Sequence, residues 1–164
     1  MACRGVHFAI AESEATRLLS ADNDLGVLEI IQDEIEERWD EDWLYQTDKA
    51  WDAIHRCLTD GTPAGGAGAY PLSHAILGGR QLHEGDDYIV SLVTPEQAAD
   101  VARALEGIDE AWLRDKYAAI DPEEYAFQKS EQDWAYTWEN FTGLVQFFKK
   151  AGEAGRWVVF TVDQ

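Results

Sequence analysis

The side chains best suited to chemistry lie close together in residues 48–59, which read DKAWDAIHRCLT. A helix that turns about 100° per residue places Asp48, Asp52 and His55 on one edge, at spacing i, i+4, i+7. A carboxylate beside an imidazole can orient the ring, and the ring can then act as a general base or a ligand. Asp48, Asp52 and His55 are therefore candidate catalytic residues.

A structural interpretation of the same edge is the more common one for a lone Asp–His pair on a helix. Asp48 would cap the N-terminus of a helix that ends near Leu58, and Asp52 and His55 would hydrogen-bond neighbouring backbone. The wheel directs Lys49 and Arg56 to solvent. We expect this edge to fasten the helix onto residues 71–79 rather than to form an active centre. The broad arc beside this edge is predicted to be buried and holds Ala50, Trp51, Ile54, Cys57 and Leu58.

A second short stretch, residues 71–79, reads PLSHAILGG and supplies Ser73 as a fourth candidate. Ser73 has no G-x-S-x-G context, and its being next to His74 is no reason to pair the two as a dyad. Residues 61–68 are rich in Gly and Ala and lack the Lys-Ser/Thr of a phosphate-binding loop, so they are predicted to be a flexible connector. If the two stretches meet in space, the four candidates would line one cleft.

No metal or cofactor site is predicted. The four histidines, at positions 7, 55, 74 and 83, show no ligand spacing such as H-E-x-x-H. Residues 40–42 are acidic but lack the EF-hand pattern.

The charge of the chain restricts its partners. Its formal net charge is −19 over 164 residues. Nucleic-acid phosphates and anionic membrane surfaces would be repelled, and no basic stripe is present. A basic protein partner or a small molecule is compatible with this charge. A homodimer formed through exposed aromatic residues such as Trp43 and Tyr45 is the alternative to a monomer.

Two cysteines without metal-ligand spacing, Cys3 and Cys57, indicate reduced thiols in a cytoplasmic protein. The apolar run near the N-terminus is interrupted by His7 and is too short for a signal peptide. No stretch approaches the roughly 20 apolar residues that span a bilayer.

The elements that must position the candidates follow from hydrophobic periodicity. Alternation predicts strands over residues 5–11 and 88–93, and an apolar run predicts a central strand over 157–162, buried on both faces. Residues 72–77 are either a fourth strand or a helical turn. Helices are predicted from Ser13 to Leu19 and over about 25–39, 48–58, 95–106, 109–117 and 131–154. These elements favour a single α+β domain over residues 1–164, with a small mixed sheet of three to four strands and helices packed on it.

The two stretches together resemble a known family. The pattern Asp48-Lys49-x-Trp51-Asp52-x-x-His55-x-x-Leu58-Thr59, followed by Pro71-Leu72-Ser73-x-Ala75-x-Leu77-Gly78, is similar to the signature of the YfbM-like family, the bacterial domain of unknown function 1877. Further likenesses at Thr94, at residues 109–114 and at 140–144 extend the resemblance over nearly the whole chain. The resemblance implies a compact cytosolic domain of helices and sheet, and it implies no activity.

Two hypotheses about function follow. The first is a non-catalytic module that binds a protein or a small ligand, because no catalytic signature accompanies the acidic surface and the many aromatic residues. The alternative is a small-molecule enzyme of the hydrolase type, with an Asp/His site at the edge formed by Asp48, Asp52 and His55, and with Ser73 nearby.

Overall fold

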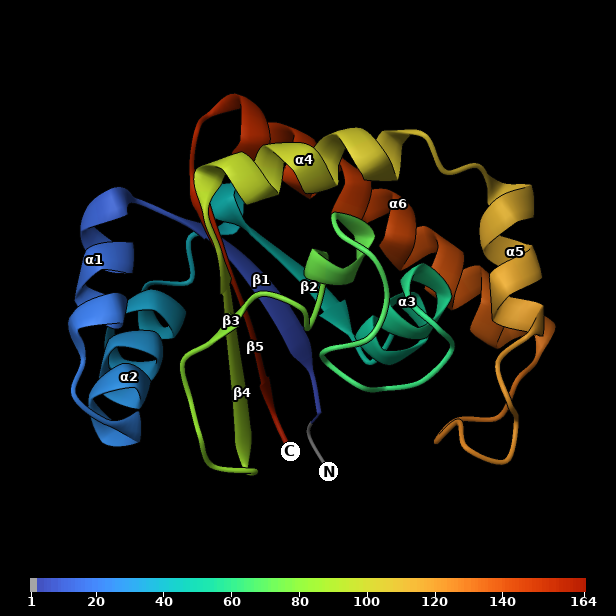
Figure 1. Ribbon diagram of the computed structural model, residues 1–164, viewed down its shortest axis with the longest axis horizontal. Helices are drawn as coiled ribbons and strands as arrows, with labels where there is room; N and C mark the ends of the chain where they lie inside the picture. Colours follow the sequence, from blue (N-terminus) through green and yellow to red (C-terminus); the bar gives the residue numbers. More distant parts are fainter. Residues whose placement is uncertain (1–2) are drawn as a thin grey trace.

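The computed structural model describes residues 3–164, and its centre is one antiparallel sheet with strand order β2-β1-β5-β4-β3 (Figure 1). Each neighbouring pair of strands runs antiparallel. The strands are β1 (Gly5–Ile10), β2 (Leu44–Asp48), β3 (Arg80–Gln81), β4 (Tyr88–Val93) and β5 (Trp157–Asp163). The C-terminal strand β5 therefore lies in the middle of the sheet, as its apolar sequence predicts.

Helices cover both faces of this sheet. In Figure 1, α1 and α2 lie on one side of the strands and α3, α4, α5 and α6 on the other. The helices are α1 (Glu12–Ser20), α2 (Asp24–Ile30), α3 (Trp51–Leu58), α4 (Pro95–Glu106), α5 (Glu110–Ala118) and α6 (Glu131–Glu153). The π-helical turn Ile31–Glu36 continues α2, and 3₁₀ turns occur at Glu41–Trp43 and Leu72–His74.

The alternation of side chains along β1 divides the core in two. Val6, Phe8 and Ile10 pack with α1 and α2, whereas Ala9 packs with α3 to α6 on the other face. Successive residues of a strand point to opposite faces, and the sequence pattern anticipates this division. His7 also lies on the second face, against Phe148 and Phe160. The sheet is thus buried on both sides.

The predicted α+β class is confirmed, two details are corrected, and one open alternative is decided. The sheet is wholly antiparallel rather than mixed, and β2 and β3 increase the strand number to five within residues 3–164. Both additional strands are edge strands: β2 has one buried residue, Thr47, and β3 has two exposed residues, so neither carries a strong apolar signal. Residues 72–77 begin with the 3₁₀ turn Leu72–His74, the helical-turn alternative.

The two aromatic residues expected to be exposed are partly buried. Trp43 lies beneath the guanidinium of Arg156 at 3.7 Å, and the Tyr45 hydroxyl donates to Asn140 at 3.3 Å. The large apolar side chains that are exposed among the described residues are Leu25, Tyr70 and Trp112. None of the helices in residues 3–164 combines the length and the apolarity needed to cross a bilayer.

Candidate functional site

Asp48 does not belong to the helix that carries the other candidates. It ends β2 with a φ of 50°, and the chain turns through Lys49 and Ala50 before α3 begins at Trp51. Its carboxylate accepts a hydrogen bond from the Tyr136 hydroxyl at 2.6 Å and pairs with Arg4 at 3.4 Å. The prediction that Asp48 caps the helix and shares an edge with Asp52 and His55 is therefore wrong, because the left-handed turn separates it from the helical register.

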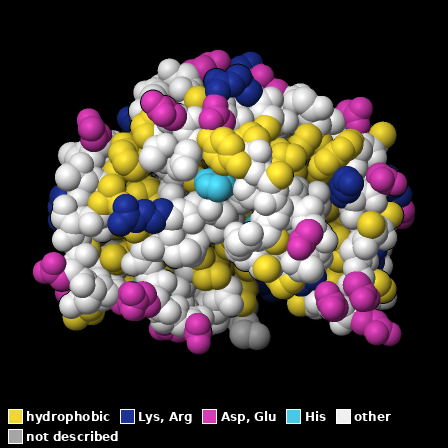
Figure 2. All heavy atoms as spheres, in the orientation of Figure 1, with side chains coloured by type: hydrophobic (Ala, Val, Ile, Leu, Met, Phe, Trp, Pro, Cys, Tyr) yellow, Lys and Arg dark blue, Asp and Glu magenta, His cyan; other side chains and the backbone are white. Residues whose placement is uncertain are grey.

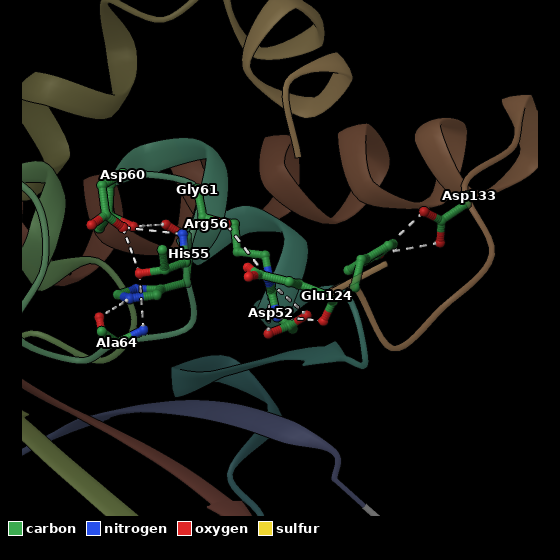
Figure 3. Close-up of polar contacts among 11 residues, drawn as sticks. Asp52, His55, Arg56, Asp60, Gly61, Ala64, Glu124 and Asp133 are labelled. Atoms are coloured by element: carbon green, nitrogen blue, oxygen red, sulfur yellow. Dashed lines mark hydrogen bonds and ion pairs between the residues drawn. The ribbon is translucent and has the colours of Figure 1, made fainter. Parts of the chain in front are cut away.

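Asp52 pairs with Arg56, one helical turn further along α3 (Figure 3). The Arg56 Nε lies 3.2 and 3.4 Å from the two carboxylate oxygens of Asp52. Its terminal nitrogens Nη1 and Nη2 donate to the carbonyls of Gly61 at 3.4 Å and Glu124 at 3.3 Å. The Arg56 side chain is only 5% exposed. The prediction that Arg56 points to solvent is wrong, because the adjoining loop at Gly61 and the distant loop at Glu124 supply carbonyl acceptors for it.

His55 is turned away from this pair and binds the connector loop (Figure 3). Its Nε2 donates to the carbonyl of Ala64 at 2.9 Å, and its carbonyl accepts from the Thr59 hydroxyl at 2.6 Å. Burial lowers the pKa of His55, so the ring is held neutral, and Nδ1 has no partner within residues 3–164. No carboxylate orients the imidazole, and the residue fastens the loop that contains Ala64 rather than residues 71–79.

Residues 71–79 are fastened instead by His7 of β1. The buried His7 ring donates through Nε2 to the carbonyl of Ala75 at 2.8 Å. Burial lowers the pKa of His7 to about 4. The sequence signal for this role is the period-2 pattern, which places His7 on the opposite face of the strand from Val6 and Phe8.

Ser73 lies in the 3₁₀ turn and is separate from the other three candidates. Its hydroxyl oxygen is 2.9 Å from Nδ1 of His74, so the two adjacent side chains are in contact. Ser73 is buried, and the pocket between this turn, β1 and β5 has a volume of about 0 Å³. The four sequence candidates therefore do not line one cleft.

The two motif stretches nevertheless meet in one hollow. A cavity of about 320 Å³ and a second of about 420 Å³ share Pro63, Leu77 and Ile89 in their walls. We call the combined hollow the motif groove. The walls of its first part comprise Cys3, Trp51, Asp52, Arg56, Pro63, Leu77, Ile89, Ala126, Phe127 and Gln164. The second part adds Gly65, Gly66, Gly78, Gly79 and Gln81.

Two glycines allow the backbone of residues 71–79 to fold back closely on itself and to lie close to β4. A Cβ on Gly78 would lie 2.0 Å from the carbonyl oxygen of Ser73, and one on Gly79 would lie 2.7 Å from the carbonyl oxygen of Leu92. Only glycine fits at either position without backbone movement. The Gly78-Gly79 pair therefore shapes the wall of the motif groove.

Sequence reasoning identified Asp52 as a site residue but missed Arg56, Ile89 and Phe127, which come from α3, β4 and the loop before α6. A signal for Arg56 was available, since it stands four residues after Asp52 and such pairs are common helix neighbours. Within residues 3–164, no three His, Cys, Asp or Glu side chains come together in a way that could hold a metal ion.

A larger hollow of about 540 Å³ lies on the other face of the sheet, between α1, α2 and the segment from Arg80 to Leu82. Its charged groups include Asp24, whose carboxylate is already held by the backbone N–H groups of Glu84 and Gly85 at 2.8 and 3.0 Å. It contains neither motif and none of the four candidates.

Comparisons with known proteins agree with the fold. The chain is similar to the crystal structure of a protein of unknown function, YfbM from Escherichia coli, at 22% identity and a TM-score of 0.67, over 97% of this chain and 99% of that one. No curated protein matches the chain. Residues 1–161 match the family described as Domain of unknown function (DUF1877). The chain belongs to this family, and its fold is that of YfbM.

Proposed function

We propose that this protein is a non-catalytic binding module that takes a small, partly apolar molecule in the motif groove. One observation carries the proposal: both motif stretches line the same groove, and a buried ion pair, Asp52–Arg56, stands in its otherwise largely apolar wall. Ligand pockets combine apolar walls with a few polar groups that orient the ligand.

The chemistry of the groove favours binding over catalysis. Asp52 is paired with Arg56 and contacts no imidazole, and the Nε2 of His55 is engaged by Ala64. A nucleophile needs an adjacent base for activation, and the groove walls in residues 3–164 pair no Ser or Thr with a histidine. Burial raises the pKa of the nearby Cys57 thiol to about 12, which keeps it protonated and unreactive.

The proposal is tested by screening small molecules against ¹⁵N-labelled protein. Binding in the motif groove is expected to shift the indole N–H of Trp51 and the amides of Gly78, Gly79 and Ile89. Ala126, an exposed residue in the groove wall, allows the groove to be filled by the substitution Ala126→Trp, and Ala135→Trp on the exposed face of α6 is the matched control. Loss of the shifts in Ala126→Trp alone supports the proposal. Shifts confined to residues 18–27 and 80–84 would contradict it.

A hydrolase-type enzyme is the second candidate, and the contact between Ser73 and His74 favours it. A hydroxyl hydrogen-bonded to an imidazole is the core of many acyl-transfer sites. Hydrolysis of short p-nitrophenyl esters that disappears in Ser73→Ala and in His74→Gln would establish this function. The original candidates at Asp48, Asp52 and His55 are tested in the same assay by Asn or Gln substitution.

The proposal also includes a cytoplasmic location in a bacterium, and it is compatible with a basic protein partner. Reduced Cys3 and Cys57 and the acidic composition support these points. On the face seen in Figure 2, however, acidic side chains are scattered around the rim rather than gathered in one patch. A pull-down at low and high salt tests for a salt-sensitive basic partner, and light scattering distinguishes a monomer from a homodimer.

A further inference from the structure

The hydrogen-bonding capacity of the Asp52–Arg56 pair is only partly used. A guanidinium has five N–H donors. The contacts of Arg56 to Asp52, Gly61 and Glu124 engage one N–H on each of its three nitrogens. Two N–H groups therefore have no partner within residues 3–164. Among the same residues, the Asp52 oxygens accept from Nε of Arg56 alone, so acceptor positions on the carboxylate are also unfilled.

The contacts that do exist are long. All four fall between 3.2 and 3.4 Å, whereas charge-assisted N–H···O bonds are usually about 2.7–2.9 Å. The guanidinium carbon also stands 5.8 Å from the centre of the Tyr125 ring, and the Tyr125 hydroxyl donates to Asp133 at 3.1 Å. Arg56 is thus held in place by Asp52, Gly61 and Glu124 without being saturated.

Both members of the pair line a cavity of about 320 Å³, although the side chain of Arg56 is only 5% exposed and that of Asp52 only 12%. That volume is at the small end of ligand pockets, which run from roughly 300 to 1,000 Å³. The rest of the cavity wall includes Trp51, Leu77, Ile89 and Phe127. The cavity wall therefore offers a cation and an anion side by side, together with apolar and aromatic surface.

Building on the proposed function, we infer that the motif groove binds a free α-amino acid with a large apolar side chain. Its carboxylate would accept from the unfilled N–H groups of Arg56, its ammonium group would donate to Asp52, and its side chain would contact Trp51 and Phe127.

Charge balance distinguishes this ligand from simpler ones. A carboxylic acid would fill Arg56 but would meet the negative charge of Asp52 and a protein of net charge −19. An amine would fill Asp52 but would meet the positive charge of Arg56. A zwitterion satisfies both and brings no net charge. A peptide is a poorer match, because at least one peptide bond separates its two charged ends.

The test is a titration of the intact wild-type protein by calorimetry and by ¹H–¹⁵N spectra, using L-phenylalanine, N-acetyl-L-phenylalanine and L-phenylalaninamide. The two derivatives lack the ammonium charge and the carboxylate, respectively. We expect L-phenylalanine to shift Trp51, Gly78 and Ile89, and each derivative to bind at least about tenfold more weakly, as expected for the loss of a charge-assisted hydrogen bond.

Variants connect the preference to the two side chains. Asp52→Asn is expected to reduce the difference between L-phenylalanine and its N-acetyl derivative to less than about threefold. Arg56→Lys keeps the charge but loses the planar guanidinium. It is expected to weaken the binding of L-phenylalanine more than the binding of L-phenylalaninamide. Ala126→Trp is expected to abolish binding with an otherwise unchanged spectrum, which keeps the test informative if either pair variant fails to fold.

The failures of the two proposals can be told apart. Equal binding of all three compounds in the groove would overturn the amino-acid inference and leave the binding module standing. The same conclusion follows if other molecules shift the resonances of the groove residues and L-phenylalanine does not. If no compound of a broad screen shifts any groove resonance, both proposals are overturned.

Discussion

His7 and the Asp52–Arg56 pair are both buried polar groups with hydrogen-bonding capacity left over, yet their surroundings differ. His7 is enclosed by the rings of Phe147, Phe148 and Phe160, and the pocket beside it has a volume of about 0 Å³. The pair borders a cavity of about 320 Å³. The Nδ1 of His7, which has no hydrogen-bond partner within residues 3–164, is therefore a cost of folding, whereas the unfilled positions of the pair belong to side chains that border an open cavity.

Buried polar residues around the groove have two different roles. His7 and His55 each donate from Nε2 to a backbone carbonyl, of Ala75 and Ala64, and so hold the segments that flank the groove. Asp52 and Arg56 form part of its wall. The imidazole of His55, a candidate general base in the sequence, thus holds a segment beside the groove, and that of His7 does the same, whereas we propose that the ion pair binds the ligand.

The largest expected effect comes from breaking the pair. Arg56→Met leaves the Asp52 carboxylate buried without its partner, and is expected to lower the free energy of unfolding by about 3–5 kcal/mol. The double variant Asp52→Leu/Arg56→Met removes both charges and is expected to recover most of this stability while losing ligand binding. Urea denaturation measures both, and a single-variant loss below about 1 kcal/mol would show that the pair is effectively solvated.

His7 is expected to cause a loss of stability in acid. Its pKa is lowered from 6.5 to about 4 by burial, so between these pH values the unfolded chain binds a proton that the folded chain does not. Stability from this residue is complete above pH 6.5 and falls as the pH is lowered towards 4, by about 3 kcal/mol. Denaturation at several pH values, with His7→Gln as a non-titrating control, measures the effect. An identical pH slope in the control would contradict it.

A substitution at Gly78 affects residues 71–79, which contact His7 through Ala75 and line the cavity of the Asp52–Arg56 pair through Leu77. The Cβ of Gly78→Ala would lie 2.0 Å from the backbone oxygen of Ser73, and relief of that contact is expected to cost about 2 kcal/mol. Gly66→Ala, where a Cβ meets nothing within 4 Å, is the matched control and is expected to change stability by less than about 0.5 kcal/mol. Similar melting temperatures for the two variants would contradict the close packing of the second motif.

The smallest effect is expected at His55. Loss of its hydrogen bond to Ala64 in His55→Ala is expected to cost about 1 kcal/mol and to make residues 61–69 more sensitive to proteases. His74→Ala is a suitable control, since the only hydrogen bond of its ring within residues 3–164 is to Ser73. Unchanged cleavage of the loop in His55→Ala would show that it is fastened by other contacts.

Much of the fold could be predicted from the sequence, since apolar periodicity reports burial directly. The predicted buried arc of α3 is confirmed, and so is the central strand β5. The site was less predictable. A charged residue such as Arg56 is assigned to solvent by default, and its burial depends on a carbonyl acceptor 68 residues away. The separation of Asp48 from the helix depends on the left-handed backbone of Asp48 itself, which the apolar periodicity does not predict.

The central claim is that the motif groove, and not the larger hollow beside α1 and α2, binds a ligand through the Asp52–Arg56 pair. The most direct measurement is a ¹H–¹⁵N titration with L-phenylalanine of the wild-type protein and of Ala126→Trp. We expect saturable shifts at Trp51, Gly78 and Ile89 in the wild type and none in the variant. Shifts that persist in Ala126→Trp, or that appear only around Leu25 and Arg80, would contradict it.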